Sequence, residues 1–375
     1  MGRMHAYRRA VLCCACALFI LMSGPVAQAK AASAADSSYA QQAAKGIERL
    51  QDWYVPQKGL YKIPTGWWNS ANSITVLVDY ARVTGKKQYL ATVANTFARA
   101  NKANGSKDFI TDSNDDAGWW ALTWIDAYDL TKNPDYLKAA EIIFADLTTQ
   151  WDTTTCGGGV WWSKNLKTAA YKNAVTNELF LAIGASLANR EPDAQKKAQY
   201  RAWAEKEWKW FKGSGMINGQ HLINDGLNAT NPKACTNNGQ TTWTYNQGAV
   251  LGGLVELHKA DGDPTLLPEA EAIAHATMTH LVTKGGVLHE PKMEGPDQPQ
   301  FKGIFIRNLV KLDHAAPRRS YKAFVDANAK SIWQNDRTGC PKCTFGGLWE
   351  GPFDSADGTR QTSALDALIG AMELK

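Results

Sequence analysis

The sequence has 375 residues, of which 44% are hydrophobic, and carries a formal charge of +5. A chain of this length can bury a large core, either as one repeat barrel or as two domains. Without the three arginines of its first 29 residues the charge falls to +2. No block of lysine or arginine occurs either, so no nucleic-acid partner is expected.

Residues 1–29 have the features of an export signal. A positively charged start precedes an apolar run at residues 10–22, and Ala27-Gln28-Ala29 forms a small-x-small cleavage site. The run is short for a bilayer span, although an uncleaved anchor is the alternative, and no later stretch reaches about 20 apolar residues. We therefore predict a signal peptide at residues 1–29, a single secreted domain at residues 30–375 and no stable membrane anchor.

Four cysteines remain after the predicted cleavage: Cys156, Cys235, Cys340 and Cys343. An even number of cysteines in an exported protein favours disulfides. Cys340 and Cys343 have C-x-x-C spacing, but a zinc site usually needs a second such pair, and a thioredoxin-like motif needs a βαβ context. We expect structural disulfides, with a local Cys340–Cys343 bridge as one option, and no metal site.

Apolar residues recur at helical spacing along the chain, and alternating β-branched runs are scarce. The helices come in pairs that begin near residues 67, 115, 173, 244, 301 and 360. Turns inside the first four pairs fall at residues 84–85, 132–135, 191–193 and 261–264, and the sixth pair runs to the C-terminus. The pattern predicts an all-α fold of six helical hairpins.

Six hairpins favour a closed ring with inner and outer helices, and an open solenoid is the structural alternative. The connections between pairs are long and rich in Gly, Asn, Thr and Trp, as in residues 156–162 and 218–243. Long connections at one end of a regular scaffold are where binding sites are usually built. We therefore expect the first turns of the inner helices to surround one mouth.

Asp115 and Asp116 head the second hairpin. Glycosidic cleavage commonly uses two carboxyl groups, and a separation of about 5 Å favours a covalent intermediate with retention. Neighbours at a helix start have Cα atoms about 3.8 Å apart and side chains that diverge by roughly 100°, which permits that spacing. The helix N-terminus would stabilise one carboxylate, and its neighbour would then keep a proton. Ordinary helix capping is the alternative.

The other inner tips carry side chains suited to a carbohydrate, because amides and acids pair with hydroxyls and aromatic rings stack on sugar faces. The candidate contacts are Asn69, Trp119, Trp120, Asn177, Tyr245, Asn246 and Lys302. Asp225 lies in a long connection and could bind a hydroxyl, although an aspartate before glycine is also a common turn residue. The tryptophans could equally belong to the core.

Several motifs, in order, resemble glycoside hydrolase family 76, the endo-acting α-1,6-mannanases. The matching segments are residues 115–120, 156–162, 172–178, 244–248 and 301–305. The resemblance implies an (α/α)6 barrel and a retaining double displacement. It implies that Asp115 is the nucleophile, Asp116 the acid/base, and Asp225 a sugar contact. Some fungal relatives are membrane-anchored, but residues 364–375 lack an apolar tail, so no glycolipid anchor is expected.

The leading hypothesis is a secreted, monomeric, retaining endo-α-1,6-mannanase that needs no cofactor or metal and acts on the α-1,6-linked backbone of mannan. One alternative is a mannan transglycosylase on the same scaffold. Another is a non-catalytic mannan-binding protein that uses the same cleft.

Overall fold

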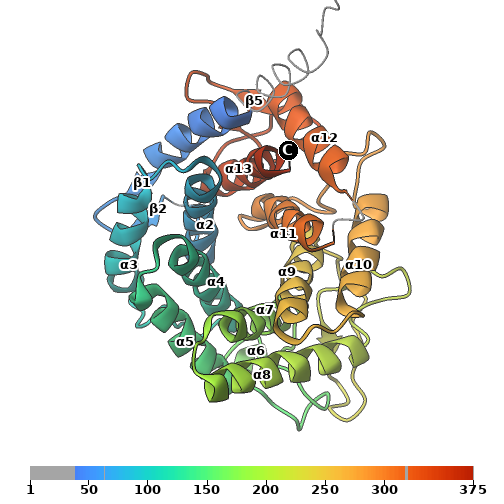
Figure 1. The fold of residues 1–375 in the computed structure, drawn as a ribbon. Helices are drawn as coiled ribbons and strands as arrows, with labels where there is room; N and C mark the ends of the chain where they lie inside the picture. Colours follow the sequence, from blue (N-terminus) through green and yellow to red (C-terminus); the bar gives the residue numbers. More distant parts are fainter. Residues whose placement is uncertain (1–38, 63, 317–319, 375) are drawn as a thin grey trace, which may run out of the picture.

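The computed structural model describes residues 39–62, 64–316 and 320–374, so the predicted signal peptide lies outside the described residues. The described chain forms two concentric rings of helices (Figure 1). The inner ring consists of α2 (Trp67–Thr84), α4 (Asn114–Thr131), α7 (Ala174–Arg190), α9 (Thr244–Asp261), α11 (Phe301–Ala315) and α13 (Gly358–Glu373). The outer ring consists of residues 39–52, α3 (Leu90–Asn104), α5 (Pro134–Thr148), α8 (Ala194–Gly213), α10 (Leu266–His280) and α12 (Lys322–Asn335).

The remaining elements are short and lie in the connections. They are the helix α6 (Leu166–Ala169), the 3-10 turn η1 (Gln298–Gln300) and three antiparallel strand pairs. The pairs join β1 (Tyr54–Val55) to β2 (Leu60–Tyr61), β3 (Leu227–Asn228) to β4 (Thr236–Asn237), and β5 (Arg337–Thr338) to β6 (Thr344–Phe345).

The inner ring is closed. Each inner helix packs against its neighbours on both sides, and α13 at the chain end packs against α2 near its start. This arrangement confirms the predicted all-α barrel and excludes an open solenoid. The predicted hairpin starts also hold, because the inner helices begin within about two residues of the predicted positions.

The sixth hairpin differs from the prediction. Its inner helix is α13, but its outer helix is residues 39–52, from the opposite end of the chain. The buried Gln361 of α13 joins these parts, because its amide nitrogen donates to the carbonyls of Gly46 (2.9 Å) and Cys343 (3.0 Å). Its amide oxygen accepts from the Phe345 N–H (2.9 Å). The chain ends therefore close the barrel together.

The inner helices are buried on nearly all sides, whereas the outer helices are amphipathic. In α7 every residue from Ala174 to Ala188 is buried, but α3 buries only Val93, Thr96 and Ala100. Close approach within the inner ring depends on small residues. A Cβ at Gly303 of α11 would lie 2.6 Å from the backbone of Ser363 in α13, so any larger residue would push the two helices apart.

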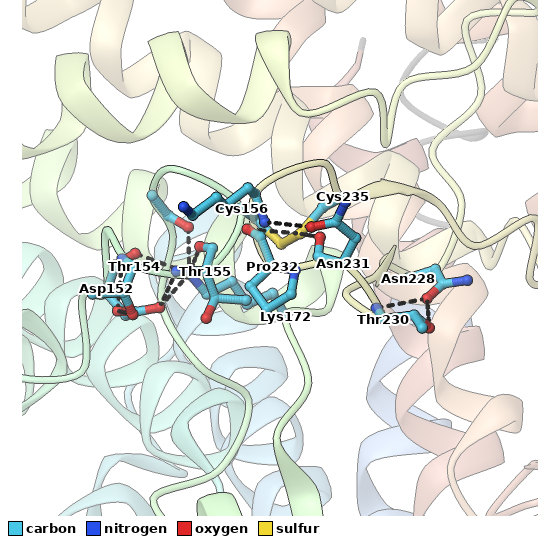
Figure 2. The surroundings of a disulfide bond; sticks show 12 residues. Asp152, Thr154, Thr155, Cys156, Lys172, Asn228, Thr230, Asn231, Pro232 and Cys235 are labelled. Atoms are coloured by element: carbon cyan, nitrogen blue, oxygen red, sulfur yellow. Dashed lines mark hydrogen bonds and ion pairs between the residues drawn. A yellow bond between two sulfur atoms is a disulfide. The ribbon is translucent and has the colours of Figure 1, made fainter.

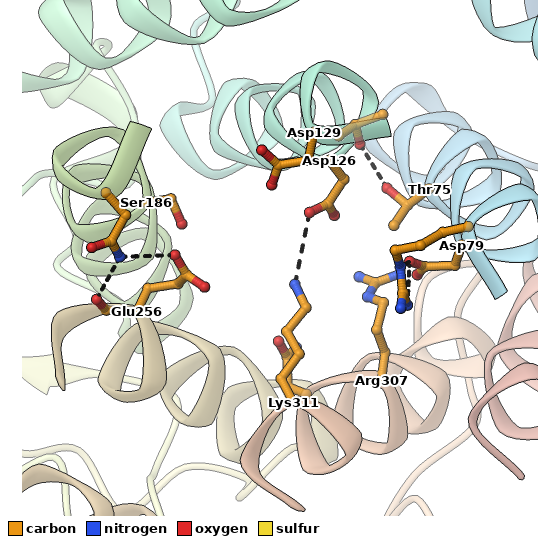
Figure 3. Close-up of polar contacts among 12 residues, drawn as sticks. Thr75, Asp79, Asp126, Asp129, Ser186, Glu256, Arg307 and Lys311 are labelled. Carbon is orange, nitrogen blue, oxygen red and sulfur yellow. Dashed lines mark hydrogen bonds and ion pairs between the residues drawn. The ribbon is translucent and has the colours of Figure 1, made fainter. Parts of the chain in front are cut away.

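Charged and polar side chains from several inner helices reach into the centre of the ring (Figure 3). Lys311 of α11 reaches across to Asp126 of α4 at 3.9 Å, and Arg307 donates to the Asn72 side-chain oxygen at 2.6 Å. A small cavity of about 30 Å³ lies here, and Trp119 forms part of its wall. In the part of the chain that the structure describes, no helix combines the length and apolarity needed to cross a membrane.

Both disulfides expected from the cysteine count are present in the described chain. Cys156 pairs with Cys235 across 79 residues, and Cys340 pairs with Cys343 within the β5–β6 connection. The sequence left the first pairing open. Because that bridge joins two connections far apart in sequence, it ties together the loops that follow α5 and α8.

We predict that Gln361→Leu lowers the free energy of unfolding by about 2–4 kcal/mol, because it removes the partner of three backbone groups in two segments, residue 46 and residues 343–345. Urea unfolding followed by tryptophan fluorescence measures the change. Gln195→Leu on the exposed side of α8 is the matched control and should leave stability within about 0.5 kcal/mol. Equal midpoints for the two variants would show that Gln361 does not hold the chain ends together.

Candidate active site

Asp115 and Asp116 lie in the first turn of α4, where unpaired backbone N–H groups favour negative charge. One Asp115 carboxyl oxygen accepts the Asp116 backbone N–H at 2.9 Å. The other accepts the indole N–H of Trp162 at 2.9 Å. Among the described residues, none donates a hydrogen bond to the Asp116 carboxyl group. The two neighbouring carboxyls therefore have unequal surroundings.

The different hydrogen bonding of Asp115 and Asp116 gives the two carboxyl groups different pKa values. Burial raises the pKa of Asp115, but hydrogen bonds from the Asp116 amide, Trp162 and Asn173 act in the opposite direction. Burial also raises the pKa of Asp116, and the charges of Asp115 and Asp297 raise it further. The two groups titrate as a coupled pair in which Asp115 is the better stabilised anion and Asp116 keeps its proton to higher pH.

The start of α4 is fixed by the connection that follows α5. The Asn114 N–H donates to the Trp162 carbonyl (2.8 Å), and the Trp162 N–H donates to the Tyr171 carbonyl (2.8 Å). Trp162 therefore holds α4 through its backbone and Asp115 through its indole ring. This double attachment sets the position of the Asp115 carboxylate.

Asp225 stands on the neighbouring rim. Its side chain accepts the Tyr171 hydroxyl at 2.6 Å, and its backbone carbonyl accepts the Ala174 N–H at the start of α7. Tyr245 of α9 lies close enough for the charges of both Asp225 and Asp115 to raise its pKa, after the larger effect of burial. The predicted residues Asp115, Asp116, Asp225 and Tyr245 thus come together at one mouth.

A cluster of aromatic rings, here called the aromatic floor, lies at the starts of four inner helices. We use this name for Trp68, Trp119, Trp243, Tyr245 and Phe301, which come from the starts of α2, α4, α9 and α11. Tyr245 and Phe301 stack with ring centroids 3.9 Å apart, and Trp68 lies 5.6 Å from Trp119. The Trp119 and Tyr245 rings are 6.4 Å apart. These contacts join the starts of four inner helices.

Three of the predicted sugar contacts are buried and serve the fold instead. Asn69 is 1% exposed, and its amide pairs with Gly66 and Gln300. Asn177 is fully buried and pairs with the backbone of Val160 and Asn173. Trp120 has no exposed surface and packs in an aromatic core cluster. None of the three presents free polar or ring surface to the mouth.

Lys302 and Asn246, also predicted as sugar contacts, are buried too. The Lys302 ammonium donates to the Gly347 carbonyl (2.6 Å), lies over the Trp349 ring, and has its pKa lowered to about 8 by burial. Asn246 is fully buried and its amide has no partner among the described residues.

Within the described residues, no group of three or more His, Cys, Asp or Glu side chains is arranged to hold a metal ion.

The connection between α5 and α6 is held by a buried lysine and the long-range disulfide (Figure 2). The Lys172 ammonium donates to the carbonyls of Asp152, Thr155 and Gly158 and to the Asp152 carboxylate. The Cys156 N–H donates to the Pro232 carbonyl at 2.7 Å, beside the Cys156–Cys235 bridge. These contacts hold the connection that leads to Trp162.

Sequence reasoning did not assign a role to Trp162, Tyr171, Trp243 or Asp297. The first two lie in or beside segments that match the family motifs, so their position was a usable signal. Asp297 lies in Pro296-Asp297-Gln298-Pro299, which reads as an ordinary turn. Only the fold brings it close to Asp116.

With this geometry in place, comparison with known proteins identifies the class. A sequence profile described as glycosyl hydrolase family 76 matches residues 30–374. The chain belongs to this family of glycoside hydrolases. The resemblance found in the motifs is thereby confirmed.

Individual relatives agree with the family. A mannan endo-1,6-alpha-mannosidase of Saccharomyces cerevisiae is 25% identical, with 87% of this chain and 77% of the relative covered. The corresponding enzyme of Candida albicans is 28% identical, with 69% and 62% covered. An inactive variant of an alpha-1,6-mannanase from Salegentibacter sp. HEL1_6, solved with alpha-1,6-mannotriose, has a TM-score of 0.80 at 23% identity, with 90% of this chain and 100% of that chain covered.

We predict that Trp162→Phe moves the acid limb of the kcat/KM profile to higher pH by roughly half to one unit. The change removes a hydrogen bond to the Asp115 anion, so the pKa of Asp115 rises and the reactive anion is lost at a higher pH. Steady-state hydrolysis across pH measures the limb. Trp161→Phe is the control, because that ring lies under Lys172 rather than beside Asp115. If the acid limb of Trp162→Phe lies at the same pH as that of the wild-type protein, the Trp162 hydrogen bond does not stabilise the reactive anion of Asp115.

Proposed function

We propose that the protein is a secreted, retaining endo-α-1,6-mannanase that cleaves the α-1,6-linked mannose backbone of mannans. The observation that carries the proposal is the unequal pair at the start of α4, a hydrogen-bonded Asp115 beside an Asp116 whose carboxyl group receives no hydrogen bond from the described residues. A retaining glycosidase needs one ionised and one protonated carboxyl group close together. The helix start supplies both from adjacent positions.

In the first step Asp115 acts as the nucleophile. One of its oxygens attacks the anomeric carbon while the bond from that carbon to the leaving oxygen breaks. Asp116 gives its proton to the leaving oxygen, so the departing mannan segment leaves as a neutral alcohol. The product of this step is a glycosyl ester on Asp115.

In the second step water attacks the same carbon. Asp116, now deprotonated, takes a proton from the water, and the ester bond to Asp115 breaks with its electron pair returning to the carboxylate. Formation of the ester removes the negative charge of Asp115, which lowers the pKa of Asp116 and prepares it to act as a base. Each carboxyl group thus returns to its starting state.

The substrate class is supported by the relatives and by the chemistry of the mouth. The relatives from Saccharomyces cerevisiae and Candida albicans are mannan endo-1,6-alpha-mannosidases, and the similar solved structure holds alpha-1,6-mannotriose. That structure was inactivated by replacing two consecutive aspartates, which is also the arrangement of Asp115 and Asp116. Asp225 contacts a sugar hydroxyl, and the partly exposed rings of the aromatic floor, Trp68, Trp243 and Tyr245, stack against a sugar ring, whereas Trp119, also predicted as a contact, is only 4% exposed.

Secretion and a monomeric state form part of the proposal. The family profile begins at residue 30, directly after the predicted cleavage site, and the two disulfides fit an oxidising compartment. The ring closes within one chain, which supports a monomeric state.

We predict that Asp115→Asn and Asp116→Asn each lower kcat on linear α-1,6-mannan by at least about 10³-fold while the fold persists. Asp115→Asn should be inactive on all substrates. Asp116→Asn should retain cleavage of an activated aryl mannoside, whose leaving group needs no proton. Full activity of either variant on mannan would overturn the assignment.

Product analysis separates the alternatives. Excess mannan acceptor yields only shorter reducing sugars from a hydrolase, whereas a transglycosylase yields new α-1,6 linkages. A wild-type chain that binds mannan without releasing reducing ends would be a binding protein. Asp112→Asn, in the exposed connection before α4, is the control and should keep wild-type kcat.

A further inference from the structure

A third carboxylate, Asp297, lies close enough to the proposed acid/base residue for its charge to raise the pKa of Asp116. It lies directly before η1, in the connection that leads to α11. Its side-chain oxygen accepts the indole N–H of Trp68 at 2.9 Å. Trp68 contacts Trp119, which sits one helical turn after Asp116 on the same face of α4. The Trp68–Trp119 pair therefore brings Asp297 and Asp116 to the same side of the mouth.

The segment that carries Asp297 is fastened to α2 at two further points. The Asn69 amide nitrogen donates to the Gln300 side-chain oxygen at 2.7 Å, and the Gln300 amide donates to the Asn69 carbonyl at 3.2 Å. The Gln300 N–H also donates to the Asp297 carbonyl at 3.0 Å. Asn69, predicted to bind sugar, instead helps to fix the backbone of Asp297. A half-buried carboxylate is thus kept near Asp116 by several independent contacts.

We propose that Asp297 is a positioning residue that keeps the proton on Asp116 through its negative charge. The inference rests on the proposed function, in which Asp116 is the acid/base. Asp297 does not need to touch the sugar for this role. Its contribution is electrostatic, because a carboxylate near a second carboxyl group favours the protonated form of that group.

Few charged groups lie close enough to Asp116 to raise its pKa. Asp115 acts from the same helix and Asp297 from the segment before η1, and burial acts in the same direction. Trp162 and Asn173, from the connection after α5 and the start of α7, are neutral donors to Asp115. The charge of Asp225 raises the pKa of Tyr245 in α9, and Asp225 is not among the groups that shift the pKa of Asp116. No lysine or arginine of the described chain offsets the effect of these carboxylates on Asp116.

Asp297 and Asp115 act differently during the reaction. The negative charge of Asp115 disappears when the glycosyl ester forms, so its influence on Asp116 is lost for the second step. The charge of Asp297 persists through both steps. It therefore keeps Asp116 protonated before cleavage and leaves it a stronger base toward water afterwards.

We predict that Asp297→Asn lowers the pKa of Asp116 by about one unit and moves the alkaline limb of kcat/KM to lower pH by the same amount. Asparagine keeps an acceptor for Trp68 and removes only the charge. Asp297→Glu should restore the wild-type limb. Glu294→Gln, which removes an exposed charge from the same connection, is the matched control and should leave the limb unchanged.

Two readouts make the outcome decisive. Titration of the Asp116 carboxyl carbon by NMR reports its pKa whether or not the protein cleaves mannan, so failure of the proposed substrate leaves this test intact. An Asp116 titration unchanged by Asp297→Asn would overturn the inference. It would also be overturned if Asp297→Asn lost mannan cleavage at every pH but kept cleavage of an activated aryl mannoside, because Asp297 would then be the proton donor itself.

Discussion

The closed inner ring is the constraint on which the site depends. Because outer and inner helices alternate along the chain, every inner helix begins at the same end of the barrel (Figure 1). Trp68, Trp119, Tyr245 and Phe301 meet there from four different helices. Closure needs both chain ends, since residues 39–52 cover α13. The mouth and its floor therefore exist only once the entire ring has formed.

Within that mouth, the indole groups of Trp162 and Trp68 help to give Asp115 and Asp116 different pKa values, although the two side chains are chemically identical. Trp162 donates to Asp115 and stabilises its anion, whereas Trp68 orients Asp297 toward the side of Asp116. Burial alone would raise the pKa values of both members of the pair. Directed hydrogen bonds and one further charge separate them, and the proposed roles of nucleophile and acid/base follow from that separation.

The sequence predicted the helix starts well, because polar or aromatic residues before an apolar run mark where inner helices begin. It could not predict the partner of α13, since a pairing between residues 39–52 and the C-terminal helix leaves no local pattern. The burial of several site candidates was equally hidden from the sequence. Asn69, Asn177 and Lys302 also stand at helix starts, where an amide or ammonium group serves equally well to tie loops to the barrel, and only burial reveals which use applies.

The assignment of Asp115 as nucleophile is the central claim, and trapping the covalent intermediate tests it most directly. A fluorinated mannoside with an activated leaving group forms a glycosyl-enzyme that hydrolyses slowly, and mass spectrometry of peptic fragments locates the label. The account predicts a single added sugar on the peptide at Asp115 and none in Asp115→Asn. A label on Asp116 or Asp297, or products with inverted anomeric configuration and no trapped ester, would contradict it.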